Sequence, residues 1–189
     1  MQPAKGAFYV MGPSGSGKDT LIQRLQSQLG SAVSVPPRYI DRPYQAGQLE
    51  QHYALSSAVF SEFQDKACFS LSWAANQHRY GYDRQWLDDV AQGKLVLLNG
   101  SRAHWPQAQQ QYPQLLPIML SLPEAEQKNR LQQRGREDAT AIAARLARSA
   151  TLTDAGIAAE CVLNAAQSPE AVLADCLQLL HHHRPSLCL

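Results

Sequence analysis

The sequence predicts an α/β protein in which a parallel sheet carries helices on both faces. Short apolar runs, typical of buried strands, alternate with segments of helical periodicity along the 189 residues. A glycine-rich turn, GPSGSGKDT at residues 12–20, separates the first such run from the first such helix. Apolar residues make up 44% of the chain and charged residues 17%, which suits one ordinary globular domain of this length.

The first elements flank this turn. Residues 7–11, AFYVM, are continuously apolar and end at a glycine, which predicts a buried strand. Residues 19–30 place four aliphatic side chains at helical spacing before Gly30, which predicts a helix. Residues 35–56 are rich in Pro, Gly, Arg and Tyr, and we expect an irregular or short-stranded substrate region there.

The middle of the chain predicts two further helices around a strand. Residues 56–66 begin with a serine suited to a helix N-cap and continue with an amphipathic pattern, so a helix is expected. Residues 68–73 alternate between apolar and polar and predict a strand. Residues 76–82 are interpreted as a turn, and 83–93 as a helix that ends at a glycine.

The remaining elements again alternate between strand and helix. Apolar runs predict strands, and amphipathic segments predict helices, the first of which starts with a proline. The strands are 94–100, 115–122 and 160–165, and the helices are 123–135, 138–150 and 168–183. Gly12, Asn99 and Asn164 all lie at carboxyl ends of these parallel strands, so we expect them to meet at one crevice.

Charge and hydropathy exclude some classes of partner. The formal net charge of +1 argues against a large nucleic-acid-binding surface. The apolar run near the N-terminus is too short for a signal-peptide core or a membrane span. We therefore expect a cytoplasmic protein without a membrane or nucleic-acid partner.

The turn at 12–20 carries the clearest chemistry. Its glycines allow backbone N–H groups to surround phosphate oxygens, and the helix that follows directs its positive dipole end at them. Lys18 can reach the terminal phosphates of ATP. We predict that the whole segment binds the nucleotide: Gly12, Pro13, Ser14, Gly15, Ser16, Gly17, Lys18, Asp19 and Thr20. The motif departs from the usual pattern because Asp19 stands where a hydroxyl residue is expected, and Thr20 follows one residue late.

Arginines gather in the second half of the chain. They are Arg130, Arg134, Arg136, Arg145 and Arg148. One interpretation is a solvated basic helix face. The other is a mobile lid whose planar guanidinium groups neutralise charge on ATP phosphates, and the adjacent phosphate loop favours this lid.

Together these stretches resemble the guanylate kinase-like branch of the nucleoside-monophosphate kinases, and more closely the ribose 1,5-bisphosphate phosphokinases of bacterial phosphonate breakdown. The resemblance covers nearly the whole length. It is carried by MGPSGSGKDT (11–20), RYIDR (38–42), HYALS (52–56), LSWAANQHRYG (71–81), LLNGSRAH (97–104), RGRE (134–137), ARLARSA (144–150) and VLN (162–164).

The resemblance implies a three-layer P-loop kinase fold in a single domain, 1–189. Its core would be 5–34 and 83–189, its acceptor-binding region about 35–82, and its arginine-rich lid about 134–148. It implies ATP and Mg²⁺ as cofactors. The expected reaction is phosphorylation of ribose 1,5-bisphosphate, a small phosphorylated sugar, to 5-phosphoribosyl 1-diphosphate, in phosphonate degradation and in PRPP and NAD supply.

Two departures from guanylate kinases bear on the acceptor. Arg42 matches the first arginine of their acceptor segment, whereas Gln45 replaces the second. Leu71 stands where guanylate kinases carry the glutamate that recognises guanine. Leucine cannot pair with a guanine N–H, and an unpaired buried polar group costs about 1–3 kcal/mol. GMP is therefore a poor candidate.

The resemblance also implies site residues. Lys18, Arg134, Arg136 and Arg145 are the expected catalytic groups, and Asn164 would lie near adenine or simply cap a strand end. The candidate acceptor ligands are cationic or aromatic: Arg38, Arg42, Tyr80, Arg102 and His104. Arg102 could instead be an ordinary surface arginine, and His104 a helix cap or a packed histidine.

The expected metal site involves Asp19, Thr20 and Asn99. The strand 94–100 ends in Asn99, where phosphate-loop enzymes usually carry an aspartate, so Asp19 would supply the missing negative charge for Mg²⁺. The alternative is that Asp19 only favours the first turn of its helix. Three alternative functions remain open: another small-molecule kinase, a catalytically silent binding module, and a nucleotide-driven switch or ATPase.

Overall fold

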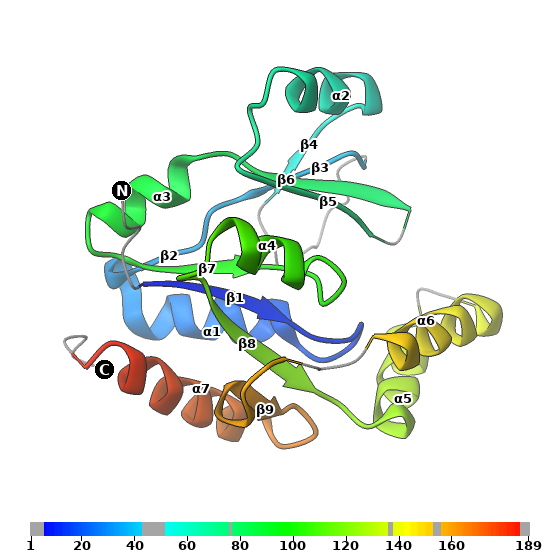
Figure 1. The fold of residues 1–189 in the computed structure, drawn as a ribbon. Helices are drawn as coiled ribbons and strands as arrows, with labels where there is room; N and C mark the ends of the chain where they lie inside the picture. Colours follow the sequence, from blue (N-terminus) through cyan, green and yellow to red (C-terminus); the bar gives the residue numbers. More distant parts are fainter. Residues whose placement is uncertain (1–5, 43–51, 76, 136–137, 153–155, 186–189) are drawn as a thin grey trace.

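A five-stranded parallel sheet forms the centre of the chain in the computed structural model (Figure 1). The structure describes residues 6–42, 52–75, 77–135, 138–152 and 156–185. The strand order is β2-β7-β1-β8-β9, and every pair is parallel, as the alternating pattern predicts. The strands are β1 (Ala7–Met11), β2 (Val33–Ser34), β7 (Leu95–Asn99), β8 (Leu116–Ser121) and β9 (Val162–Asn164).

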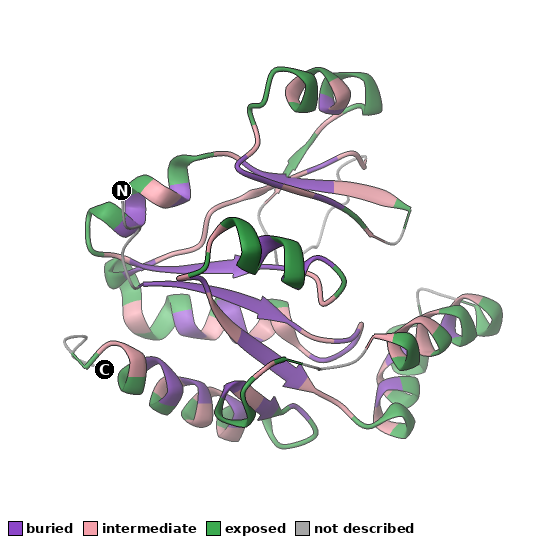
Figure 2. Cartoon of the chain, in the orientation of Figure 1, coloured by how far each residue is buried: buried purple, intermediate pink, exposed green. Residues whose placement is uncertain are grey.

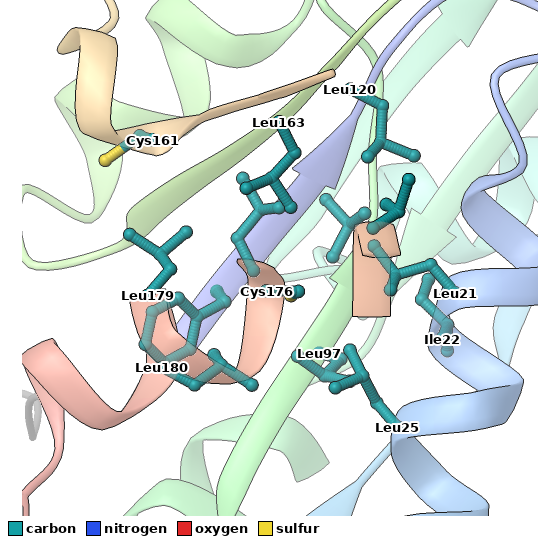
Figure 3. Packing of buried hydrophobic residues seen from close by; sticks show 14 of the residues in the cluster. Leu21, Ile22, Leu25, Leu97, Leu120, Cys161, Leu163, Cys176, Leu179 and Leu180 are labelled. Atoms are coloured by element: carbon teal, nitrogen blue, oxygen red, sulfur yellow. The ribbon is translucent and has the colours of Figure 1, made fainter. Parts of the chain in front are cut away.

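One face of this sheet packs against helices α1 (Lys18–Leu29) and α7 (Pro169–His183). Figure 3 shows the aliphatic side chains of both helices meeting those of β7, β8 and β9. The opposite face packs against α3 (Gln85–Ala91), α4 (Trp105–Gln111) and a second sheet. All five residues of β1 are buried because both faces are covered (Figure 2).

The second sheet has four strands in the order β4-β3-β6-β5. Its strands are β3 (Arg38–Ile40), β4 (His52–Ala54), β5 (Leu71–Ala75) and β6 (His78–Tyr82), and the helix beside them is α2 (Ser57–Asp65). Pairs β3–β6 and β5–β6 are antiparallel, whereas β3–β4 is parallel. This sheet lies inside the segment 35–82 that is predicted to bind the acceptor.

The predicted turn at 76–82 is wrong for residues 78–82, which form β6; Asn76 lies outside the described residues. Pairing on both sides overrides the polar local sequence. Arg79 reinforces this pairing, because its Nε donates to Asp41 Oδ2 at 2.7 Å and its Nη1 donates to Ser61 Oγ of α2 at 2.9 Å. The strand predicted at 68–73 begins at Leu71.

Helices α5 (Glu124–Arg134) and α6 (Ala139–Thr151) form a hairpin beyond the carboxyl end of β8 (Figure 1). We call this pair the α5–α6 hairpin. Short 3-10 turns at Gly30–Ala32 and Ala159–Cys161 precede β2 and β9. None of the helices in the described part of the chain is long and apolar enough to span a membrane.

Candidate active site

The phosphate loop leaves β1 at Gly12 and enters α1 at Lys18. Gly12 has φ of +156°, and a Cβ there would lie 2.7 Å from the carbonyl oxygen of Leu120 and 2.8 Å from Ser16 Oγ. Only glycine therefore allows the loop to pack this closely against β8. Ser16 Oγ is buried and has no hydrogen-bond partner among the described residues, so it is available to a bound oxyanion.

Lys18 is held inside this loop. Its Nζ donates to the carbonyl oxygens of Gly12 at 3.0 Å and Pro13 at 3.2 Å. The pKa of Lys18 is lowered to about 8, mainly by burial; Asp19 opposes this shift, and the charges of Arg38, Arg102 and Arg134 add to it. Several cations thus converge around Lys18, and a polyphosphate would relieve their mutual repulsion.

Asn99, the last residue of β7, forms hydrogen bonds with residues of three other elements. Its N–H donates to Tyr82 Oη of β6 at 2.8 Å, and its carbonyl accepts from Arg38 Nη1 of β3 at 3.0 Å. Its side-chain Nδ2 donates to Asp19 Oδ1 at 2.7 Å. Asn99 Oδ1 is buried without a hydrogen-bond partner in the described parts of the chain.

Asp19 lies in the first turn of α1, where its charge favours the helix, and its carboxylate also accepts the hydrogen bond from Asn99. The structure therefore brings two of the three predicted metal-site residues together. Their oxygens, Asp19 carboxylate and Asn99 Oδ1, are of the kind that Mg²⁺ prefers. The third residue, Thr20, lines a neighbouring pocket on the α1 side.

An aromatic column connects the second sheet to the central sheet. The guanidinium of Arg38 lies 5.0 Å from the ring centroid of Tyr80. Tyr80 stacks on Trp73 at 5.5 Å, and Trp73 stacks on His104 at 4.9 Å. His104 Nδ1 then lies 2.9 Å from Tyr9 Oη on β1. The predicted acceptor residues Arg38, Tyr80 and His104 are thus brought into one stack.

His104 occupies this stack as a packed residue. Its side chain is buried, and burial lowers its pKa to about 4, so the imidazole is neutral at physiological pH. Tyr9 Oη also accepts from Ser101 N at 3.1 Å, and a Cβ at Gly100 would clash with the Tyr9 ring. The arrangement favours the packing alternative over an anion-binding role for His104.

The predicted arginines of the α5–α6 hairpin and of the loop after β7 contact different parts of the molecule. Arg145 Nη1 donates to Ser14 Oγ in the phosphate loop at 2.8 Å. Arg102 instead contacts the end of α6, through Ser149 and Leu152. Arg42 is half-buried just after β3, and Arg136 and Gln45 lie outside the described residues.

A cavity of about 360 Å³ lies between the phosphate loop, the end of α5 and the loop after β9. Its polar lining comes from Ser16, Thr20, Arg24, Arg130, Gln133, Arg134 and Gln167. Arg130 and Arg134 both belong to the arginine cluster noted in the sequence, although only Arg134 was predicted to be a catalytic group; spacing by four on one helix places both on the same face. Asn164 is not part of this lining, because its Oδ1 accepts from Ala166 N at 3.0 Å and stabilises the turn after β9.

Comparison with known proteins places this site in a family. A ribose 1,5-bisphosphate phosphokinase of Desulfomicrobium baculatum is 43% identical over 147 residues, covering 75% of this chain and 76% of that protein. The Yersinia pestis protein of the same name is 44% identical over 146 residues, covering 75% and 74%. The chain belongs to the ribose 1,5-bisphosphate phosphokinase family. The Laribacter hongkongensis member is 46% identical over 144 residues, but these are 76% of this chain and 35% of that longer protein.

Solved structures place the ribose 1,5-bisphosphate phosphokinase family fold among small kinases. Guanylate kinase from Anaplasma phagocytophilum superposes with a TM-score of 0.65 at 15% identity, covering 100% of this chain and 90% of that one. A sugar kinase from Janibacter has a TM-score of 0.52 at 17% identity, covering 98% and 99%. These likenesses confirm the predicted P-loop kinase fold. No family model matches the chain.

Proposed function

We propose that this chain transfers the γ-phosphoryl group of ATP to the 1-phosphate of ribose 1,5-bisphosphate and releases 5-phosphoribosyl 1-diphosphate. Family membership supports the reaction class, since the relatives carry that name. The observation that distinguishes this acceptor from GMP is Leu71. Its side chain is 1% exposed in the apolar cluster beneath the second sheet, so the position offers no carboxylate to a guanine edge.

The nucleotide half of the proposed site is the phosphate loop with the cavity beside α5. The Lys18 ammonium would exchange its two carbonyl partners for the β- and γ-phosphates. Arg145, already bonded to the loop at Ser14, would bring a second cation to the transferred group. Arg134 lines the cavity and adds a third.

The acceptor half is carried by the second sheet and the residues that follow β3. An acceptor that carries two phosphates needs several cationic donors, and Arg38 and Arg42 come from β3 and the residues after it. Arg38 lies over Tyr80 and is bonded to the end of β7, which fixes its guanidinium beside the Asp19–Asn99 pair. We propose Arg38, Arg42 and Tyr80 as the acceptor ligands.

The chemistry then requires positioning and charge neutralisation. The attacking oxygen belongs to a phosphate that is already anionic at neutral pH, so no strong general base is needed. The γ-phosphorus–oxygen bond to ADP breaks as the bond to the acceptor oxygen forms, and ADP leaves with the electron pair. Lys18, Arg134 and Arg145 stabilise the charge that spreads over the transferred group.

Asp19 and Asn99 would hold Mg²⁺, with Thr20 as a third candidate. The Oδ1 of Asn99, buried and without a hydrogen-bond partner among the described residues, fits a cation ligand, and Asp19 supplies the negative charge. When bound there, the cation would supply positive charge that offsets the charge of the phosphates. Asp19 would thereby replace the strand-end carboxylate that the sequence lacks at position 99.

Parallel assays test this proposal. The purified protein is incubated with ATP and Mg²⁺ and with ribose 1,5-bisphosphate, GMP, gluconate or no acceptor, and ADP formation is followed. We expect turnover with the bisphosphate to exceed that with every other acceptor by at least about a hundredfold. Clear GMP turnover without bisphosphate turnover would overturn the proposal. ATP binding without any turnover would favour a silent binding module, and equal hydrolysis without acceptor would favour an ATPase.

A further inference from the structure

Arg102 connects the loop after β7 to the far end of the α5–α6 hairpin. Its Nη2 donates to Ser149 Oγ at 2.8 Å, and its Nη1 donates to the carbonyl oxygens of Leu152 at 3.2 Å and Ser149 at 3.4 Å. Leu152 is the C-cap residue of α6, and Ser149 lies in its last turn. One guanidinium therefore binds the exposed acceptors at a helix C-terminus, where a cation is favoured.

Helix α6 buries little apolar surface. Ile142 is its one buried residue. A cavity of about 410 Å³ separates it from the phosphate loop and the end of β8, with Pro13, Met119, Leu146 and Leu152 in its lining. Apolar packing therefore contributes little to holding α6 in place, and the hydrogen bonds from Arg102 contribute more.

Two contacts that α6 makes with the core, through Arg145 and Ser149, lie one helical turn apart. Arg145 and Ser149 are four residues apart and so share a face of the helix. Arg145 touches Ser14 in the phosphate loop, while Ser149 is fixed by Arg102. Holding Ser149 in place therefore fixes the position of α6 along its axis and its rotation about that axis. In that position Arg145 reaches the phosphate loop.

We propose that Arg102 is a positioning residue that acts through Arg145, rather than a ligand of the acceptor phosphate. It anchors the C-terminal end of α6 so that the Arg145 guanidinium lies at the phosphate loop before ATP arrives. The proposal rests on the phosphotransferase function proposed above. The planar fork of arginine matters here, because a lysine ammonium cannot span a hydroxyl and two carbonyls in this geometry.

Hydrogen exchange tests the anchor without using activity. In the full-length protein without nucleotide, Arg102→Ala should speed amide exchange in α6 by about tenfold or more, the worth of a hydrogen bond from a charged donor. Arg102→Lys should restore little of the protection. Arg184→Ala, which removes an arginine bonded to the Gly93 carbonyl far from α6, is the matched control and should leave α6 unchanged. Unchanged exchange in Arg102→Ala would overturn the anchor.

Kinetics distinguishes positioning from acceptor binding. Arg102→Ala should lower kcat by about ten- to a hundredfold, while the acceptor KM changes less than about threefold. Ser149→Ala should lower kcat by about threefold, and adding it to Arg102→Ala should cost nothing more. Thr151→Ala, which removes a hydroxyl that donates to the Arg148 carbonyl within α6, should leave kcat unchanged.

The two proposals fail in different ways. If Arg102→Ala raises the acceptor KM more than about tenfold while α6 exchange and Ser149→Ala behave like wild type, Arg102 is an acceptor ligand and the anchor is overturned. If the wild-type protein does not turn over ribose 1,5-bisphosphate, yet Arg102→Ala still loosens α6, the anchor stands and the proposed reaction fails.

Discussion

Asn99 Nδ2 donates a hydrogen bond to Asp19 Oδ1 at 2.7 Å, joining the end of β7 to the first turn of α1. The pair places a carboxylate and an unpartnered amide oxygen beside the phosphate loop. Asp19→Asn should raise the Mg²⁺ concentration needed for half-maximal turnover by about tenfold or more. Adding Asn99→Asp restores the charge and should recover part of the response. An Asp19→Asn enzyme with a normal Mg²⁺ titration would refute this role.

Removing the Lys18 ammonium tests the nucleotide-binding half of the proposed site. Lys18→Ala should lower kcat by about 10²–10⁴-fold, because the alkyl stump cannot neutralise charge on the transferred phosphoryl group. Lys66→Ala is a suitable control, since Lys66 forms an exposed pair with Glu62 on α2 and such pairs contribute little. Near-normal turnover by Lys18→Ala would be incompatible with the proposed mechanism.

The lowered pKa of Lys18 predicts that ATP binding takes up a proton. Burial brings this pKa to about 8, so the ammonium loses its proton as pH rises through that value in the nucleotide-free protein. ATP phosphates favour the charged form and raise the pKa again, so ATP affinity should fall above pH 8. Calorimetry near that pH, in two buffers of different ionisation enthalpy, should reveal proton uptake. Lys18→Arg should abolish the uptake, and its persistence would assign it to another group.

Tyr9 should stabilise the region after β7 through its hydroxyl. Tyr9→Phe leaves Ser101 N–H and His104 Nδ1 without their partner in a buried setting, which should lower the free energy of unfolding by about 1–3 kcal/mol. Urea denaturation measures the change. Tyr112→Phe is the control, because its half-buried hydroxyl makes a long, 3.4 Å contact with the Ser70 carbonyl. Equal effects in the two variants would contradict the role of Tyr9.

The sequence allows prediction of the central sheet because local signals there agree with the fold. The run 7–11 is apolar throughout, and the structure buries it on both faces as β1. The helices that begin at Ser57, Ala139 and Pro169 each follow a serine or aspartate whose side chain accepts a backbone N–H. In these segments propensity, capping and burial favour the same structure.

The errors arise where distant partners decide the structure. Strand β6 forms because β3 and β5 pair with it, although its local sequence predicts a turn. No element was predicted between 101 and 114, where α4 forms with Trp105 and Ala108 packed into the core. The contacts of Arg102 join residues 47 and 50 positions apart, which spacing along one element cannot reveal.

The central claim is that a phosphate, and not a hydroxyl or a nucleobase-bearing acceptor, receives the phosphoryl group. Phosphorus-31 NMR of a reaction containing ATP, Mg²⁺ and ribose 1,5-bisphosphate observes this directly. The account predicts that the 1-phosphate singlet disappears and two coupled diphosphate resonances grow as ADP forms, while the 5-phosphate signal stays. Loss of ATP without coupled diphosphate signals on the sugar would contradict it.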